Sequence, residues 1–294
     1  MPQRKLEPQY NHCMAAKPEP LKPILTVHLF PKLEAMLIEL LTSLSAEDWE
    51  KQTLAPKWKV KDVAAHLLDT QLRKLSLARD GYVAERPDLS KDDGLVDFIN
   101  RLNAGGVGIF RRLSPPVLIE LMRLASQQSI EYHHSLDAFA DAIFPVSWAG
   151  ERKSQNWFDT ARELTERWHH QQQIREAVNK PGIMTREFYF PVLDTFMRAL
   201  PFGYRNVPAA AGSMAQFNVA GDCGHSWFLY RDDEAWTLTV APHGKKIAET
   251  TIPQEIAWRI FTKGIDRQSA LAEMQTEGES EIGQHILNVR AIVG

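Results

Sequence analysis

Apolar residues recur every three or four positions through most of residues 31–178, which is the period of an α-helix. The run L-E-A-M-L-I-E-L-L-T-S-L predicts a first helix that stops near Ser45. A second helix is expected from about residue 60, and Gly81 offers a C-cap at its end. The last helix of this half is predicted from about Phe158 to Val178, since the breakers Lys180-Pro181-Gly182 follow it.

Two more helices are expected between these. One runs from Gly94 to Leu113, and the next begins at Ser114-Pro115, with serine as N-cap and proline in the first helical position, and continues toward Phe139. The first of the two should kink or break, because three glycines weaken its interior: Gly105, Gly106 and Gly108.

The pattern changes after about Leu200, where short runs rich in β-branched and aromatic residues alternate with turns. Four strands are expected within residues 208–253. Turn residues separate them: Gly221, Asp232-Asp233 and His243-Gly244. A helix over Gln254–Phe261, a strand near Leu271–Gln275 and a final helix from Glu279 to Arg290 complete this half.

These elements indicate an α+β protein of two domains, for which 294 residues provide enough chain. An up-down helix bundle is expected over residues 22–190, and a small α+β domain over residues 200–294. Prolines and a glycine gather at the boundary, between Pro191 and Pro208. The first 21 residues are polar and proline-rich and lack the apolar segment of a secretory signal, so we expect a flexible leader.

The charge of the chain excludes two classes of partner. With 34 basic and 37 acidic residues and no long run of one sign, neither a nucleic-acid surface nor a membrane patch is indicated. The two cysteines, Cys13 and Cys223, suggest no disulfide framework, so a reducing cytoplasm is expected. We interpret Cys223 as a turn cysteine rather than a reactive thiol.

Candidate chemistry lies in the stretch E-R-W-H-H-Q-Q-Q, which begins at Glu166. Residues four apart stack on one helix face, so Glu166 and His170 could both reach one metal ion, and Gln173 continues that face. The same spacing is also common on solvated helix faces. Glu163 and Arg167 are interpreted in that way, as a solvated pair on the same helix.

A metal site needs a further ligand from another helix, and His66 is the candidate. It stands among aliphatic residues in W-K-V-K-D-V-A-A-H-L-L. A lone histidine in such a setting is more often a core residue than a ligand. Its combination with Glu166 and His170 favours a metal site.

Two motifs resemble a known family. The pattern W-x-V-x-D-V-A-A-H-L, from Trp58 to Leu67, resembles the first signature of the DinB-like metal-binding bundles, in particular the mycothiol-dependent maleylpyruvate isomerase branch. The second signature of that branch is E-x-x-x-H-x-x-D, and this chain has Gln173 in place of the aspartate. The resemblance implies that His66, Glu166 and His170 bind the metal. The tail A-W-R-I-F-T-K-G-I is similar to the family's sterol-carrier-like C-terminal domain.

The resemblance implies an isomerase or S-transferase that depends on a metal and a thiol. The expected cofactors are a divalent ion, zinc or else nickel, and a low-molecular-weight thiol, mycothiol or another. The expected partners are the thiol and a small-molecule substrate, with no nucleic acid and no membrane, and a homodimer is left open. Because Gln173 is neutral, the orientation of a ligand beside it can differ from the family pattern.

Alternatives remain open at this point. The metal could activate water for hydrolysis, or it could be structural in a carrier of apolar ligands, which a fourth ligand such as His169 or His134 would favour. Arg205 and Arg231 are candidate cations for an anionic substrate, although surface ion pairs explain them equally well. For His133 and His134, a polar helix face is the simpler interpretation.

Overall fold

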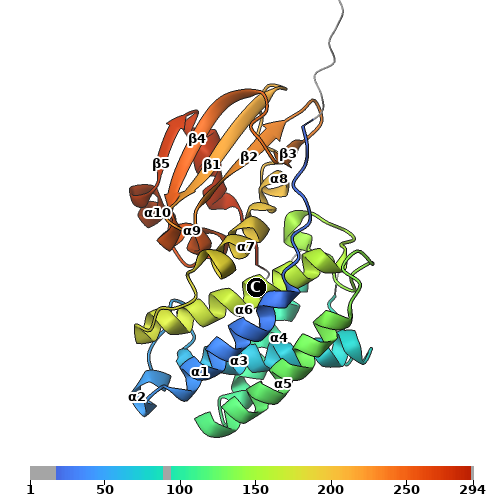
Figure 1. Ribbon diagram of the computed structural model, residues 1–294, viewed down its shortest axis with the longest axis vertical. Helices are drawn as coiled ribbons and strands as arrows, with labels where there is room; N and C mark the ends of the chain where they lie inside the picture. Colours follow the sequence, from blue (N-terminus) through green and yellow to red (C-terminus); the bar gives the residue numbers. More distant parts are fainter. Residues whose placement is uncertain (1–17, 89–93, 293–294) are drawn as a thin grey trace, which may run out of the picture.

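The computed structural model describes residues 18–88 and 94–292, which form a helical part and a sheet-containing part (Figure 1). The predicted α+β fold class is confirmed. The first 17 residues of the predicted leader, with Cys13, lie outside the described residues. The helical part consists of α1 (Phe30–Thr42), α2 (Ala46–Trp49), α3 (Val60–Lys74), α4 (Gly94–Phe110), α5 (Pro115–Ser135) and α6 (Asn156–Val178), with short turns η1 (Val27–Leu29), η2 (Leu75–Arg79) and η3 (Ser147–Ala149).

The apolar faces predicted from the sequence form the core of this bundle. Leu37, Leu67, Met122 and Ile174, from four different helices, are almost fully buried together. The helix ends also follow the sequence, since Gly81 takes a left-handed conformation after α3 and η2, and α6 stops at the left-handed Asn179. These caps fix the lengths of the two helices that carry the candidate ligands.

The break predicted at the glycines of α4 is wrong, because this helix continues without interruption from Gly94 to Phe110. Gly106 lies directly against the carboxyl group of Asp69 on α3, where an added Cβ would come within 2.1 Å of Asp69 Cγ. The glycine therefore allows two helices to approach closely, and this tertiary contact outweighs its low helix propensity.

The second part is built on a five-stranded sheet with the order β3-β2-β1-β4-β5. The central pair β1 and β4 is parallel, and the other pairs are antiparallel. The strands are β1 (Ser213–Ala220), β2 (His225–Arg231), β3 (Trp236–Thr239), β4 (Lys245–Pro253) and β5 (Gln275–Gly278). The helices are α7 (Arg186–Met197), α8 (Leu200–Gly203), α9 (Gln254–Phe261), α10 (Arg267–Glu273) and α11 (Ser280–Gln284), followed by the turn η4 (His285–Asn288).

Two predictions for the end of the chain need correction. The strand expected near Leu271–Gln275 is mostly helix α10, and β5 begins only at Gln275. The final helix expected from Glu279 to Arg290 is the short α11 followed by a 3-10 turn.

Helix α7 joins the two parts, since it packs on α6 and on α9 (Figure 1). Tyr189 of α7 stacks on Trp168 of α6 with ring centroids 4.7 Å apart, and its hydroxyl donates to the carbonyl of Gln254. At the start of the described chain, Pro20 forms a β-bridge with Thr239 before the chain reaches α1. One hydrophobic core therefore runs through both parts. Across the described residues, no helix is both long and apolar enough to cross a membrane.

Candidate metal centre

The three predicted ligands lie together between α3 and α6. His66 comes from α3, and Glu166 and His170 come from neighbouring turns of α6. One potential ligand atom from each residue lies within 4.8 Å of the other two. Zinc lies about 2.0–2.2 Å from nitrogen and oxygen ligands, so small side-chain rotations would bring all three onto one ion.

Gln173 orients the imidazole of His170. Its Oε1 lies 2.9 Å from His170 Nδ1, and an amide oxygen can only accept a hydrogen bond. The ring proton is thereby placed on Nδ1, and the lone pair is left on Nε2, which lies 3.6 Å from Glu166 Oε2. The amide in place of the family's aspartate still fixes the tautomer that a metal ligand needs.

The imidazole of His66 is deeply buried and lacks a hydrogen-bond partner at one nitrogen. Its Nδ1 has none among the described residues, although 97% of the residue surface is buried. Burial, helped by the neighbouring His170, holds the pKa of His66 well below its usual value. A neutral imidazole with an unpartnered buried nitrogen fits a metal ligand better than a satisfied core histidine.

Trp58 forms a wall of the site that the sequence analysis missed. Its ring centroid lies 4.7 Å from that of His66 and 5.9 Å from that of His170. The loop before it is ordered by Thr53 and Gln52, whose side chains donate to the carbonyl of Trp58. The position of Trp58 within the first signature was the available signal for this contact.

Glu166 is the solvent-facing member of the group, with 35% of its side chain exposed. Burial tends to raise the pKa of its carboxyl group, but the adjacent imidazoles of His170 and His169 outweigh this, and the pKa is lowered. The carboxylate is therefore ionised at neutral pH, as metal binding requires.

Neither histidine suggested as a fourth ligand belongs to the group. His169 packs against the ring of His170, and its Nδ1 lies 2.8 Å from the carbonyl of Thr165. His134 is exposed on α5. Among the described residues, the group contains these three side chains alone, so a metal ion held there would have coordination positions open to other molecules.

Several ion pairs lie on the ligand-bearing face of α6, between the candidate ligands and the N-terminus of this helix. Lys74 of α3 donates to Asp159 Oδ2 at 2.8 Å and to Glu163 Oε1 at 3.1 Å, and its side chain is only 9% exposed. Arg162 is held by the same two carboxylates. Asp159, Glu163 and Glu166 lie at helical spacing, so these pairs begin one turn from the ligands.

The predicted solvated pair between Glu163 and Arg167 is wrong. Arg167 is buried and pairs with Glu34 of α1, while a second guanidinium nitrogen donates to Ser129 of α5 at 2.7 Å. Arg167 points toward the interior of the bundle, about 100° around the helix from Glu166. This buried pair ties three helices together behind the ligands.

The four other candidate residues, His133, Cys223, Arg205 and Arg231, lie outside the ligand group. His133 is buried on α5 rather than on a polar face, with Nδ1 2.6 Å from the carbonyl of Ser129. Cys223 is also buried, and burial raises the pKa of its thiol, in agreement with an unreactive turn cysteine. Arg205 donates to the carbonyl of Phe202 and covers its ring, and Arg231 ends β2 beside β3.

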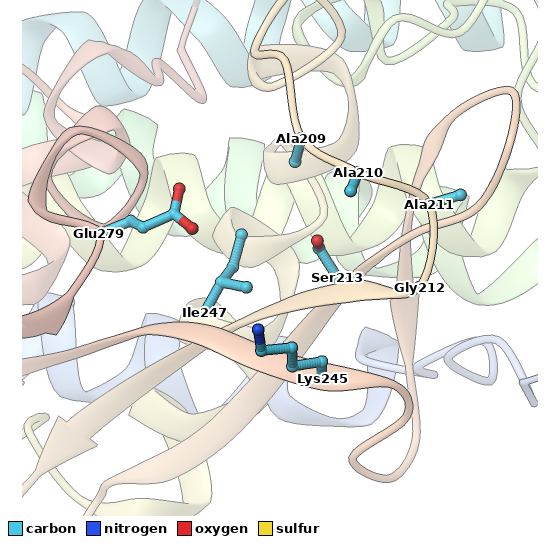
Figure 2. Close-up of a pocket in the computed structure, with 8 residues that line it drawn as sticks. All are labelled: Ala209, Ala210, Ala211, Gly212, Ser213, Lys245, Ile247 and Glu279. Atoms are coloured by element: carbon cyan, nitrogen blue, oxygen red, sulfur yellow. The ribbon is translucent and has the colours of Figure 1, made fainter.

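A separate cavity of about 230 Å³ lies at the start of β1 and β4 (Figure 2). Ser213, Lys245 and Glu279 point toward it, and alanines and an isoleucine complete its lining. All its lining residues lie between Ala209 and Glu279 in the sheet-containing part, whereas the candidate ligands lie on α3 and α6. The cavity therefore belongs to a different region from the candidate metal centre.

The helical part of the chain resembles a known protein family. Residues 30–175, from α1 through most of α6, match the mycothiol maleylpyruvate isomerase N-terminal domain family. The helical bundle of this chain therefore matches the N-terminal domain of this family. The resemblance inferred from the two signatures is thus confirmed, while metal binding by the three residues stays a prediction.

Two solved structures from this family are also similar. One is described as the mycothiol-dependent maleylpyruvate isomerase, with 12% identity and a TM-score of 0.44. The other is a histidine-to-alanine mutant under the same name, with 11% identity and a TM-score of 0.46. Each comparison covers 80% of this chain and 86% of the other. No curated protein matches the sequence.

Proposed function

We propose that this chain is a metal- and thiol-dependent enzyme that isomerises an electrophilic alkene or transfers a thiol to it. The observation that carries the proposal is the convergence of His66, Glu166 and His170, with ligand atoms within 4.8 Å of one another. The match of residues 30–175 to a domain family named for mycothiol and isomerisation supports the same chemistry. Mycothiol or another low-molecular-weight thiol would be the cofactor.

Two imidazoles and a carboxylate suit zinc, with nickel as the alternative. Such an ion, when bound, would hold a thiol sulfur as thiolate at neutral pH, whereas a free thiol has a pKa of about 8.5. The protein would contribute the orientation. Gln173 keeps the lone pair of His170 on Nε2, and Trp58 covers the two imidazoles on one side. The partly exposed Glu166 marks the side from which a substrate would arrive.

The proposed reaction uses the thiolate as a nucleophile. Its sulfur adds to one carbon of a double bond conjugated to a carbonyl group, and the electron pair moves to the carbonyl oxygen. Rotation about the new single bond, followed by return of the electron pair, expels the thiolate and leaves the trans isomer without net transfer of protons or electrons. If a proton captures the adduct instead, the protein acts as an S-transferase.

Metal analysis of the purified protein tests the site. We expect about one zinc ion per chain in the wild type and close to none in His66→Ala, because the two remaining ligands share one helix. His134→Ala is the matched control, since His134 is exposed on α5, and should keep the wild-type content. Equal metal content in wild type and His66→Ala would overturn the site.

Thiol binding is tested on the cobalt-substituted protein. Addition of mycothiol or glutathione should produce a sulfur-to-cobalt charge-transfer band if the thiol enters the open position. A spectrum that does not change on thiol addition would favour the second candidate, a metal-dependent hydrolase in which the open position binds water.

The carrier alternative receives less support. The core of the C-terminal part is filled by large side chains, among them Tyr204, Phe217 and Trp227, which are almost fully buried. The 230 Å³ cavity beside β1 is smaller than the usual pockets for drug-sized ligands, which begin at about 300 Å³. A lipid-binding assay on the full chain tests this alternative, and we expect no saturable binding.

A further inference from the structure

The charges around the candidate metal centre bear on the class of substrate. On the ligand-bearing faces of α3 and α6, each cation that the structure describes is held by a carboxylate. Arg73 donates to Asp69 at 2.7 Å, and Lys74 and Arg162 are shared by Asp159 and Glu163. From the C-terminal part, Arg259 of α9 pairs with Glu176 of α6 at 3.0 Å.

These cations are also fixed in place. Lys74 lies over the ring of Phe144 at 5.0 Å and has almost no exposed surface. Arg73 makes a second hydrogen bond, to Asn103 of α4, and Asp69 below it is closed off by Gly106. Swinging any of these groups toward a ligand would leave a carboxylate without its partner in a poorly solvated place, which is costly.

The net charge of the site follows from this pairing. Lys74 and Arg162 balance Asp159 and Glu163, Arg73 balances Asp69, and Arg259 balances Glu176. Glu166 alone is left, so a bound divalent ion gives the centre one positive charge in excess. A thiolate sulfur would neutralise that charge and leave none for a second anion.

We infer that the site prefers an uncharged conjugated electrophile and discriminates against carboxylates, most strongly against dicarboxylates, unlike the maleylpyruvate isomerases named among its structural relatives. The inference rests on the proposed function but concerns only the charge of the electrophile. A second carboxylate would enter a partly buried region in which the described cations are already neutralised, so it would lose hydration without gaining a partner.

Three maleyl compounds with the same cis double bond test this charge preference: maleate, its monomethyl ester and its dimethyl ester. Isomerisation and thiol addition are followed with the zinc-loaded protein and mycothiol or glutathione, and each rate is divided by the rate without enzyme, since the esters react faster on their own. We expect the rate enhancement for the dimethyl ester to exceed that for maleate at least tenfold, with that for the monomethyl ester between the two. Equal enhancements, or a preference for maleate, would overturn the inference.

Two variants test the origin of the preference. Asp159→Asn and Glu163→Gln each remove one carboxylate from Lys74 and Arg162, so the enhancement for maleate should rise at least fivefold while that for the dimethyl ester changes less than twofold. Glu249→Gln makes the same charge change and frees Lys246 on the outer face of the sheet, and should leave both unchanged. If both variants fold, as judged by thermal unfolding, and neither alters the ratio, the assignment to this network is wrong.

Binding provides a readout that does not depend on turnover. Calorimetry with the unreactive succinate and its dimethyl ester, on the thiol-saturated zinc protein, should give weaker binding for succinate. If thiol binds to cobalt and no electrophile reacts, the proposed function fails while this comparison still decides the charge preference. Tighter binding of succinate than of its ester would refute the preference itself.

Discussion

At the level of single residues, Gln173 controls the tautomer of the candidate metal ligand His170, because it holds the ring proton on Nδ1. Gln173→Leu should weaken zinc affinity about 10- to 100-fold, the usual cost of losing such a partner. Gln173→Glu keeps an acceptor and adds a negative charge, so its affinity should equal or exceed that of the wild type. Competition with a fluorescent chelator measures both constants, and unchanged affinity in the leucine variant would contradict the assigned role.

His133 should make stability depend on pH. Burial, together with nearby Arg167, lowers its pKa to about 4 from the usual value of 6.5. The unfolded chain therefore takes up a proton between pH 6.5 and pH 4 that the folded protein does not. Stability falls as pH drops through this window, by up to about 3 kcal/mol at its lower end.

Urea unfolding of His133→Gln at pH 7 and pH 5 isolates this contribution from those of other titrating groups. The loss of stability between the two values should be smaller in the variant than in the wild type by about 2 kcal/mol. The exposed His134, on the same helix, supplies the control His134→Gln, for which we expect the wild-type loss. An equal loss in all three proteins would show that His133 is not the buried neutral group.

At the level of elements, the contact between α3 and α4 depends on Gly106 and not on its neighbour Gly105. A Cβ at Gly105 meets nothing within 4 Å, so Gly105→Ala should stabilise the protein by up to about 1 kcal/mol through helix propensity. Gly106→Ala would push Asp69 away from Arg73 and should cost about 1–3 kcal/mol. Thermal unfolding of the pair measures the difference, and a stabilised Gly106→Ala would disprove the close contact.

Local sequence patterns predicted most helices and strands correctly. They failed where a contact with a distant part of the chain determines the secondary structure. The helices and the strands within residues 208–253 have clear periods. The segment around Leu271 has none, and there the side chain of Asp266 caps α10 while pairing with β4 fixes β5. Helical spacing alone predicted that Glu166 and His170 share one face. His66 was chosen because it could complete their ligand set and because the family motif contains it. Its position beside them depends on the packing of α3 on α6.

The partners of charged residues were the least predictable part of the site. Arg167 has a carboxylate one turn away at Glu163, yet it pairs with Glu34, which lies more than a hundred residues earlier in the chain. Sequence spacing cannot identify such a partner, because the choice depends on which neighbouring helix covers each face of α6. The charge balance around the ligands, and with it the inferred substrate class, therefore required the structure.

At the level of the whole molecule, the two parts share one hydrophobic core. Trp168 of α6, Tyr189 of α7 and Trp258 of α9 pack against one another, and the same core continues to Phe217 in the sheet. The N-terminal segment adds two hydrogen bonds. The carbonyl of Glu19 accepts from the amide of Val240, and the carbonyl of Lys22 accepts from the side chain of Arg198, directly after α7. We therefore expect the bundle and the sheet to unfold as one cooperative unit.

A cavity placed in the bundle alone tests this expectation. Leu118 of α5 is fully buried in the cluster of the bundle helices and does not belong to the core shared with the sheet, so Leu118→Ala should cost about 2–5 kcal/mol. If unfolding is cooperative, hydrogen exchange in increasing denaturant should show the protection of β1 amides lost at the same lowered midpoint as that of α5 amides. The exposed Leu124 on the same helix gives the control Leu124→Ala, which should leave both midpoints nearly unchanged. Should β1 keep its wild-type midpoint while α5 opens early, the shared core would not couple the two parts, and the C-terminal part would be free to move relative to the candidate metal centre.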